Sequence, residues 1–422
     1  MKKFKVILIG AGNRGIRYTD EMKLREDKFE IVAVAEPIDS RRNYIKEKHN
    51  IPEDMCFKDW HPLLELGKIA DIAIVSTMDR QHFEPAMLAI SLHYDLLLEK
   101  PMAPTYEECA AIKEAALKNN VKVVVCTVLR YTPLFIKIKE IIDSGKIGKV
   151  VAINHEECVG NIHQSHSFVR GNWGNSEKSS CMLLQKSCHD LDLLQWLLNK
   201  KCKSIQSFGS LSYFTRENAP INTPEYCVEG CRLKDECVYN AVKLYFDDKN
   251  NDWFRTTCTR LANPTDSQVL DAITHTQYGK CVYKCDNNVV DHQVVNMCFE
   301  DDVTVSFVMN AFNKGGRNMH IMGTKGEIRA VLGDDDSTGI HLYDFSTKTE
   351  EDIQIQGSDG VNGGHGGGDG GIVETLYHYL NNDYFGKSIP DIEESFYNHM
   401  LVFAAEKSRE QNCVIDISKF LH

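Results

Sequence analysis

The chain lacks any apolar run approaching the roughly 18 residues that a membrane-spanning helix requires. It also lacks an excess of positive charge, because 48 Lys and Arg residues stand against 60 Asp and Glu residues, for a net charge of −12. This acidic balance argues against nucleic acid or an anionic membrane surface as the main partner. The segment from Met1 to Phe4 runs directly into a strand pattern and leaves no room for a signal peptide. We therefore expect a cytoplasmic protein.

Standard C-x2-C pairs are also missing, although the chain contains 15 cysteines. Without a secretory signal, these cysteines are expected to be thiols or metal ligands rather than disulfides. Two groups stand in one region of the chain, Cys227-x3-Cys231-x5-Cys237 and Cys281-x3-Cys285. Four such thiolates can hold a structural Zn²⁺, and the hypothesis is a zinc site made by Cys227, Cys231, Cys237 and Cys285, with Cys281 as an alternative fourth ligand. An iron–sulfur cluster and ordinary buried thiols remain as alternatives.

At 422 residues the chain is long enough for two or three domains. Residues 1–128 alternate short apolar strands with helical patterns, which predicts a doubly wound parallel sheet, a Rossmann domain. Residues 129–422 are expected to form an α+β domain with a large open mixed or antiparallel sheet, because strand patterns dominate from about 201 to 345. Helices are expected at 183–198, 372–381 and 391–410, and we expect those within 372–410 to pack back on the Rossmann domain.

A glycine motif follows the first predicted strand and opens a helix. It reads Gly10-Ala11-Gly12-Asn13-Arg14-Gly15, and an acidic residue, Glu36, ends the second strand 21 residues after Gly15. The glycines allow backbone N–H groups to reach a pyrophosphate at a helix N-terminus, and the carboxylate can accept hydrogen bonds from ribose hydroxyls. The motif predicts a dinucleotide site and favours NAD. Arg41 and Arg42, just beyond the second strand, keep NADP open.

Four later motifs stand in a specific order with the glycine loop. They are Thr77 with His82, Glu99-Lys100-Pro101, Arg130-Tyr131-x-Pro133, and His189-x-x-Asp192. Together they resemble the glucose–fructose oxidoreductase, inositol dehydrogenase and MocA (Gfo/Idh/MocA) family over essentially the whole chain. The resemblance implies a Rossmann domain, a substrate domain with an open sheet, and a homo-oligomer, a dimer or a tetramer. With the motif above, it implies cofactor binding by Gly10, Gly12, Asn13, Arg14, Gly15, Glu36, Thr77, His82, Glu99 and Lys100.

The resemblance places Lys100 near the nicotinamide and the reacting carbon, with His189 as the second catalytic candidate. Oxidation of an alcohol requires a base, and a free lysine is protonated at neutral pH, so Lys100 needs burial to act as that base or else polarises the substrate oxygen as a cation. Dehydrogenases of the family often carry an aspartate four residues before this histidine, where the chain has Gln185. The substrate-binding residues that we expect are Lys100, Arg130, Tyr131, Gln185, Lys186, His189 and His365, the last in a glycine-rich loop at 357–371.

The resulting hypothesis is an NAD(P)-dependent oxidoreductase that transfers a hydride between the cofactor and a sugar, a sugar derivative or inositol. The missing aspartate and the loop around His365 keep an alternative open, an NAD-dependent glycoside hydrolase that recycles its cofactor. A non-catalytic nucleotide sensor is a third alternative, disfavoured because Lys100 and His189 are both present.

Overall fold

The computed structural model describes residues 2–333, 338–355, 365–384, 386 and 388–420. Its N-terminal part is a six-stranded sheet in which all neighbouring strands are parallel. The strands in spatial order are β3 (Cys56–Phe57), β2 (Phe29–Ala35), β1 (Phe4–Ile9), β4 (Ile72–Val75), β5 (Asp95–Leu98) and β6 (Val123–Val125). The winding direction reverses between β1 and β4, and ligands of such sheets bind at the carboxyl ends of the strands beside this point. The predicted doubly wound parallel sheet is confirmed.

Five helices connect these strands. They are α1 (Asn13–Lys23), α2 (Asp39–His49), α3 (Trp60–Glu65), α4 (Phe83–Ser91) and α5 (Tyr106–Asn119). The Thr105 hydroxyl accepts a hydrogen bond from the Glu108 backbone N–H at 3.3 Å, so α5 begins where the sequence signal placed it.

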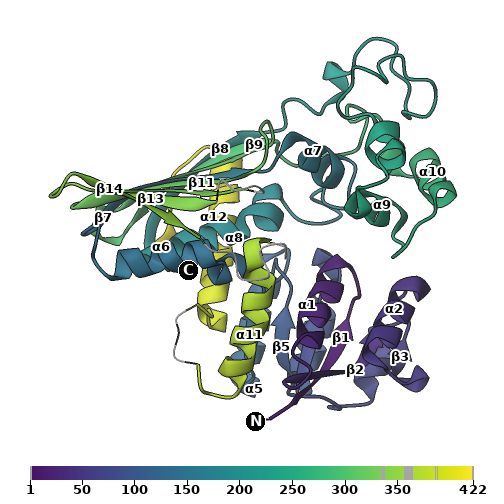
Figure 1. The fold of residues 1–422 in the computed structure, drawn as a ribbon, viewed down its shortest axis with the longest axis horizontal. Helices are drawn as coiled ribbons and strands as arrows, with labels where there is room; N and C mark the ends of the chain where they lie inside the picture. The colour runs from purple at the N-terminus through teal and green to yellow at the C-terminus, as the bar shows by residue number, and fades with distance from the viewer. Residues whose placement is uncertain (1, 334–337, 356–364, 385, 387, 421–422) are drawn as a thin grey trace.

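The last helices of the chain pack against the first sheet. Helix α11 (Gly368–Leu380) places Ile372, Val373 and Leu376 in one buried cluster with Val6 and Leu8 of β1. Helix α12 (Ile392–Gln411) contacts α5 and also α8 (Met182–Leu198) in the second half of the chain. Figure 1 shows α11 beside α1. The two ends of the chain therefore share one hydrophobic core.

The second sheet has nine strands. In spatial order they are β14 (Thr349–Gln354), β13 (Gly339–Asp344), β12 (Gly326–Leu332), β11 (Gly316–Gly323), β7 (Val150–Cys158), β10 (Thr304–Asn310), β9 (His292–Phe299), β8 (Cys202–Ser210) and β15 (Ile415–Asp416). The β7–β10 pair is parallel and the other pairs are antiparallel, so the predicted large mixed sheet is confirmed. Outward-facing polar side chains on the central strands, such as Asn154, Asn296 and Thr304, are exposed.

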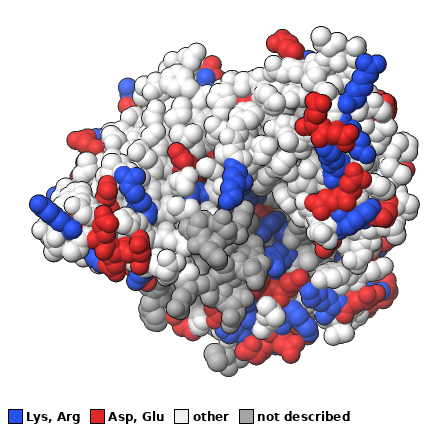
Figure 2. Space-filling view, turned by 45° about the horizontal axis from the view of Figure 1, so that its top comes forward, with Lys and Arg blue, Asp and Glu red and all other residues white. Residues whose placement is uncertain are grey.

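The prediction that strands dominate from 201 to 345 is wrong for residues 211–291, which lie between β8 and β9. This insertion carries α9 (Asp252–Thr259) and α10 (Asp266–His275), and its only strand-like pairing in the described structure is an isolated bridge, Tyr226 with Lys280. Helix α10 begins with a capping box of Thr265 and Gln268, a helix signal that the sequence does carry. Figure 1 shows the insertion apart from the sheet and above α1 and α2. In Figure 2 the surface is hollowed near its centre, and Lys and Arg side chains lie in the hollow.

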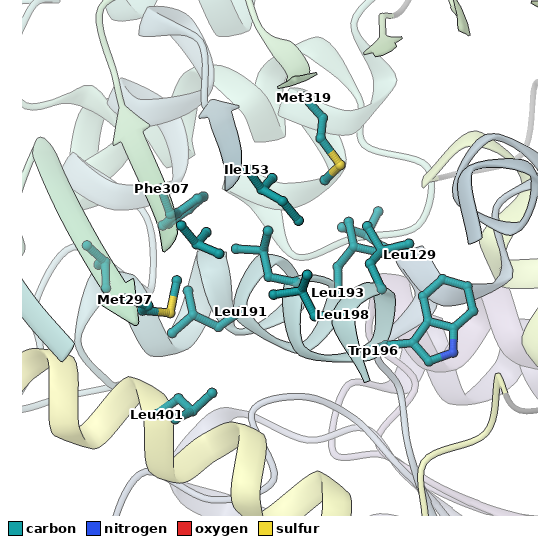
Figure 3. Close-up of a cluster of buried hydrophobic side chains, with 14 of the residues drawn as sticks. Leu129, Ile153, Leu191, Leu193, Trp196, Leu198, Met297, Phe307, Met319 and Leu401 are labelled. Carbon is teal, nitrogen blue, oxygen red and sulfur yellow. The ribbon is translucent and has the colours of Figure 1, made fainter. Parts of the chain in front are cut away.

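Helix α8 is the centre of the second half of the chain. Every residue of it except Lys186 is buried, because it lies between the nine-stranded sheet and α12. Figure 3 shows Leu191 and Leu193 of α8 between strand residues such as Phe307 on one side and Leu401 of α12 on the other. The residues that the sequence places on this helix are therefore held in a rigid core.

Candidate active site

The glycine loop after β1 contains three glycines with different environments. Gly10 has φ of +90°, and a Cβ at Gly15 would lie 2.2 Å from the Gly10 carbonyl oxygen, so both positions need glycine for the loop itself. A Cβ at Gly12, the N-cap of α1, would meet only Arg41 Nη1, at 4.0 Å. The fold therefore leaves space open at Gly12, where a pyrophosphate approaches the backbone in dinucleotide sites.

This difference predicts that Gly12→Val folds normally but binds NAD⁺ at least about tenfold more weakly, a loss of about 1.4 kcal/mol. The valine side chain fills the space that the phosphates need, and φ of −71° at Gly12 suits any residue. Calorimetry measures the affinity, and Gly339→Val in β13, a second glycine whose Cβ position has no contact closer than 3.5 Å, is the matched control. An unchanged NAD⁺ affinity in Gly12→Val would contradict this placement of the site.

Glu36 lies at the carboxyl end of β2 and is 4% exposed. Its carboxylate accepts hydrogen bonds from the backbone N–H of Ala11 at 2.7 Å and of Ile38 at 3.0 Å, which fixes the glycine loop against the second strand. Arg42 is already bonded to the Glu36 carbonyl oxygen and to Asp39, whereas no ion pair joins Arg41 to a carboxylate within the described ranges. Of the two arginines that keep NADP open, Arg41 alone is available to a ligand.

Arg14, predicted to bind the cofactor, has a side chain that joins three parts of the chain. Its guanidinium donates to Glu99 Oε1 at 2.7 Å and to both carboxylate oxygens of Asp369, at 3.0 and 2.7 Å. Tyr18 also donates to Glu99 at 2.7 Å. Burial raises the pKa of the Glu99 carboxyl, but the positive charges of Arg14 and Lys100 more than offset it and hold that pKa below its ordinary value. Asn13 is exposed at the start of α1.

Lys100 follows β5 and reaches across to α8. Its Nζ donates to the Gln185 carbonyl oxygen at 2.5 Å. The nearby His82 ring holds this turn, with Nδ1 2.8 Å from the Pro101 carbonyl oxygen and Nε2 3.1 Å from that of Thr77. The structure thus brings the Glu99-Lys100-Pro101 motif next to α8, the helix predicted at 183–198.

On α8, Gln185 and His189 lie one turn apart and are both buried. Lys186, between them, pairs with Glu157 of β7 at 3.1 Å, and burial, together with the positive charge of Arg317, lowers the Lys186 pKa. The neighbouring Asp190 is fully buried and pairs with Arg317 at 2.8 Å. Lys186 and Asp190 of α8 therefore pair with charged side chains of the nine-stranded sheet, Glu157 and Arg317.

Arg130 and Tyr131, two of the predicted substrate residues, lie in the interior. Arg130 is 0% exposed and donates to both carboxylate oxygens of Asp192, at 2.7 and 2.8 Å, and to Glu394 at 2.8 Å. Tyr131 is 3% exposed and belongs to the core cluster of β1 and α11. Buried side chains of this kind hold neighbouring segments in place, and they are not exposed to contact a substrate.

The glycine-rich loop at 357–371 is described only from residue 365, and the His365 side chain lies outside the described part. Its Asp369 is 1% exposed because it pairs with Arg14. No sequence motif indicated this pairing, nor the contacts of Tyr18, Glu157 and Arg317. Their partners are distant in the chain, and no local sequence pattern marks them.

The structure does not support the predicted zinc site. Within the described residues, which include all 15 cysteines, no group of three or more His, Cys, Asp or Glu side chains is arranged to hold a metal. Cys227 packs in one aromatic cluster, while Cys237 and Cys285 pack against another. Cys227 is a buried thiol, whereas Cys231, Cys237, Cys281 and Cys285 are only partly buried.

Family models match both halves of this architecture. Residues 4–127 match the Gfo/Idh/MocA model described as an oxidoreductase family with an NAD-binding Rossmann fold, and residues 139–417 match its C-terminal alpha/beta domain. The chain belongs to this oxidoreductase family. The resemblance in the motifs is thereby confirmed.

Individual relatives of this oxidoreductase are distant. YteT of Bacillus subtilis (strain 168) is 26% identical over 324 residues, 73% of this chain and 72% of that protein. Inositol 2-dehydrogenase of Salmonella typhimurium is 26% identical over 220 residues, 52% of this chain and 60% of that protein. The structure of scyllo-inositol dehydrogenase from Lactobacillus casei, with bound NAD(H) and scyllo-inositol, matches with a TM-score of 0.66 and 15% identity over 99% of this chain and 100% of that one, which shows the fold. No helix in the described parts of the oxidoreductase has both the length and the apolar character to span a membrane.

Proposed function

We propose that this oxidoreductase is an NAD-dependent dehydrogenase that oxidises a CH–OH group of inositol, a sugar or a sugar derivative. The observation that carries the proposal is the Lys100 Nζ contact to the Gln185 carbonyl, which joins the carboxyl edge of the parallel sheet to α8, the helix on which His189 lies. Two of the similar proteins are named as inositol dehydrogenases, which supports a polyol or sugar as the substrate class. Neither the family models nor these relatives support the glycoside hydrolase alternative.

The residues of the loop fit a dinucleotide. The open space at Gly12 admits the diphosphate, and Glu36 keeps lone pairs for ribose hydroxyls although two backbone N–H groups already bind it. A carboxylate at this position disfavours a 2′-phosphate, so we infer a preference for NAD over NADP. When bound, the nicotinamide ring supplies the hydride acceptor.

Two side chains then act on the substrate. The Lys100 ammonium donates a hydrogen bond to the substrate oxygen and stabilises the negative charge that develops there. His189 accepts the hydroxyl proton, a role suited to an imidazole near neutral pH. Gln185 cannot take a proton, so the pair of Lys100 and His189 replaces the aspartate and histidine arrangement, and the buried core around α8 keeps both residues in place.

The test is a panel of inositols, free sugars and glycosides incubated with the purified protein and NAD⁺ or NADP⁺. Growth of the reduced-nicotinamide absorbance in proportion to substrate, with NAD⁺ preferred, is the expected result. Release of many aglycone molecules per cofactor without net reduction would contradict the proposal, and so would a lack of turnover on the whole panel by protein that binds NAD⁺.

We also propose that the exposed strand face bearing Asn154, Asn296 and Thr304 contacts a second copy of the chain, in a dimer or tetramer. Sedimentation of the purified protein measures the mass directly. A charged substitution, Asn296→Lys, is expected to shift the protein toward the monomer, and a wild-type monomer would contradict the proposal.

A further inference from the structure

A cavity of about 910 Å³ lies between the first sheet and the insertion at 211–291. Met78, Arg80 and Gln81, which follow β4, line one side of it, and Arg260 and Tyr278 of the insertion line the other. The loop after β4 is adjacent to the glycine loop, because the Ser76 hydroxyl donates to the Gly10 carbonyl at 2.7 Å. The cavity therefore borders the edge of the sheet where a dinucleotide binds in folds of this kind.

The loop after β4 is bonded to the segment at 173–180, which precedes α8. The buried Asp79 carboxylate accepts hydrogen bonds from Trp173 Nε1 at 3.2 Å and from the hydroxyls of Ser179 and Ser180 at 2.9 and 2.8 Å. Arg80 donates to the Ser176 carbonyl at 3.0 Å. These bonds fix the segment at 173–180 against the first domain.

Arg170, three residues before this segment, is bonded to the insertion. This fully buried side chain donates to the Lys280 carbonyl at 2.8 Å and to the Tyr239 carbonyl at 2.7 Å. Because Lys280 lies two residues after Tyr278, the cavity wall that carries Tyr278 is held in a defined place over the first sheet.

Arg260 lines the cavity, and Arg41 lies beside the glycine loop next to it. Arg41 Nη1 lies 4.0 Å from the position of a Gly12 Cβ, and both Arg41 and Arg260 interact electrostatically with Tyr278. Burial lowers the pKa of Arg41, the charge of Glu36 opposes this, and the positive charge of Arg260 lowers it further. No ion pair links either arginine to a carboxylate within the described ranges. There the Arg260 guanidinium donates a hydrogen bond only to the Asn172 side-chain oxygen, at 3.4 Å. Two nearby guanidiniums repel each other, and an anion bound between them offsets this repulsion.

We propose that the insertion completes the dinucleotide site, with Arg260 and Arg41 binding one phosphate group of the dinucleotide from opposite sides. The inference rests on the proposed cofactor site and extends it to a part of the chain outside the Rossmann domain. Guanidiniums suit this role because their N–H groups match phosphate oxygens in pairs. The phosphate is either the diphosphate, which NAD and NADP share, or the 2′-phosphate, which only NADP carries.

The test compares Arg260→Gln with wild type by calorimetry, with NAD⁺, NADP⁺ and adenosine as ligands. Loss of one charge-assisted contact is expected to raise the dinucleotide Kd on the order of tenfold and to leave adenosine unchanged. Equal weakening of NAD⁺ and NADP⁺ identifies the diphosphate, and weakening of NADP⁺ alone identifies the 2′-phosphate. Arg260→Lys, which keeps the charge, is expected to recover part of the affinity.

Arg232→Gln is the matched control, because Arg232 is an exposed arginine of the same insertion that does not line the cavity. Unchanged affinity for both dinucleotides in a folded Arg260→Gln protein would overturn this inference while leaving the proposed function intact. Failure of the wild type to bind either dinucleotide would overturn both.

Discussion

Replacing Lys100 with methionine is expected to lower turnover of the CH–OH substrate by roughly 10²- to 10⁴-fold, the usual contribution of a group that handles charge or protons in the transition state. Methionine keeps most of the unbranched stem and removes the ammonium that contacts the Gln185 carbonyl. The substrate oxygen then loses its positively charged partner. Initial rates with saturating NAD⁺ measure kcat, and calorimetry measures NAD⁺ affinity, which is expected to fall much less than kcat because the glycine loop and Glu36 supply the main dinucleotide contacts of the proposed site.

Lys203→Met is the matched control, since Lys203 is a half-exposed lysine on β8 paired with Asp302 and distant from the cleft. It is expected to leave kcat unchanged. A Lys100→Met protein that retains wild-type kcat would remove Lys100 from the reaction. If NAD⁺ affinity and kcat instead fell in parallel, Lys100 would be assigned to cofactor binding.

Replacing Arg130 with methionine is expected to lower the free energy of unfolding by about 3–5 kcal/mol. The guanidinium is fully buried and bonds Asp192 through two hydrogen bonds, so its removal leaves a carboxylate in the core without its counter-charge. Denaturant titration followed by fluorescence measures the change. The kcat of the folded fraction is expected to change little, because the Arg130 and Asp192 side chains are both buried and do not reach the surface.

The double variant Arg130→Met with Asp192→Leu is expected to recover much of this loss, since replacing a buried ion pair by apolar groups is often nearly neutral. Lys137→Met breaks an exposed pair with Glu140 and is expected to change stability by no more than about 1 kcal/mol. A similar small change for Arg130→Met would show that Arg130 does not stabilise the core as its position indicates.

Local sequence patterns predicted those parts of the molecule that local physics determines. The glycine loop, the buried parallel strands, and helices such as α5 and α8 depend on residues close together in the chain, and the structure has them where expected. The helical insertion was missed because its helices are short, eight and ten residues, and strand patterns surround them on both sides. The Thr265 capping box was the signal that was available.

The site was harder to predict than the fold because its contacts join distant segments. Arg14 and Asp369 are 355 positions apart, so nothing near Arg14 indicates that its charge is already paired with a protein carboxylate. The cysteine spacing failed for a related reason. Cys227 and Cys237 belong to two different hydrophobic clusters, although the two thiols are near enough to interact electrostatically, and spacing along the chain does not show whether such thiols converge on a metal.

The pairing of Arg14 with Asp369, and of β1 with α11, also affects how the chain folds during synthesis. The first sheet leaves the ribosome early, but the helix that covers Val6 and Leu8 is made only after strands β7 to β14 of the second sheet. Until α11 arrives, one apolar face of the sheet stays exposed and Arg14 lacks one of its carboxylates. A fragment ending near residue 128 is therefore expected to aggregate, and the nascent Rossmann domain is expected to stay aggregation-prone until α11 has been made.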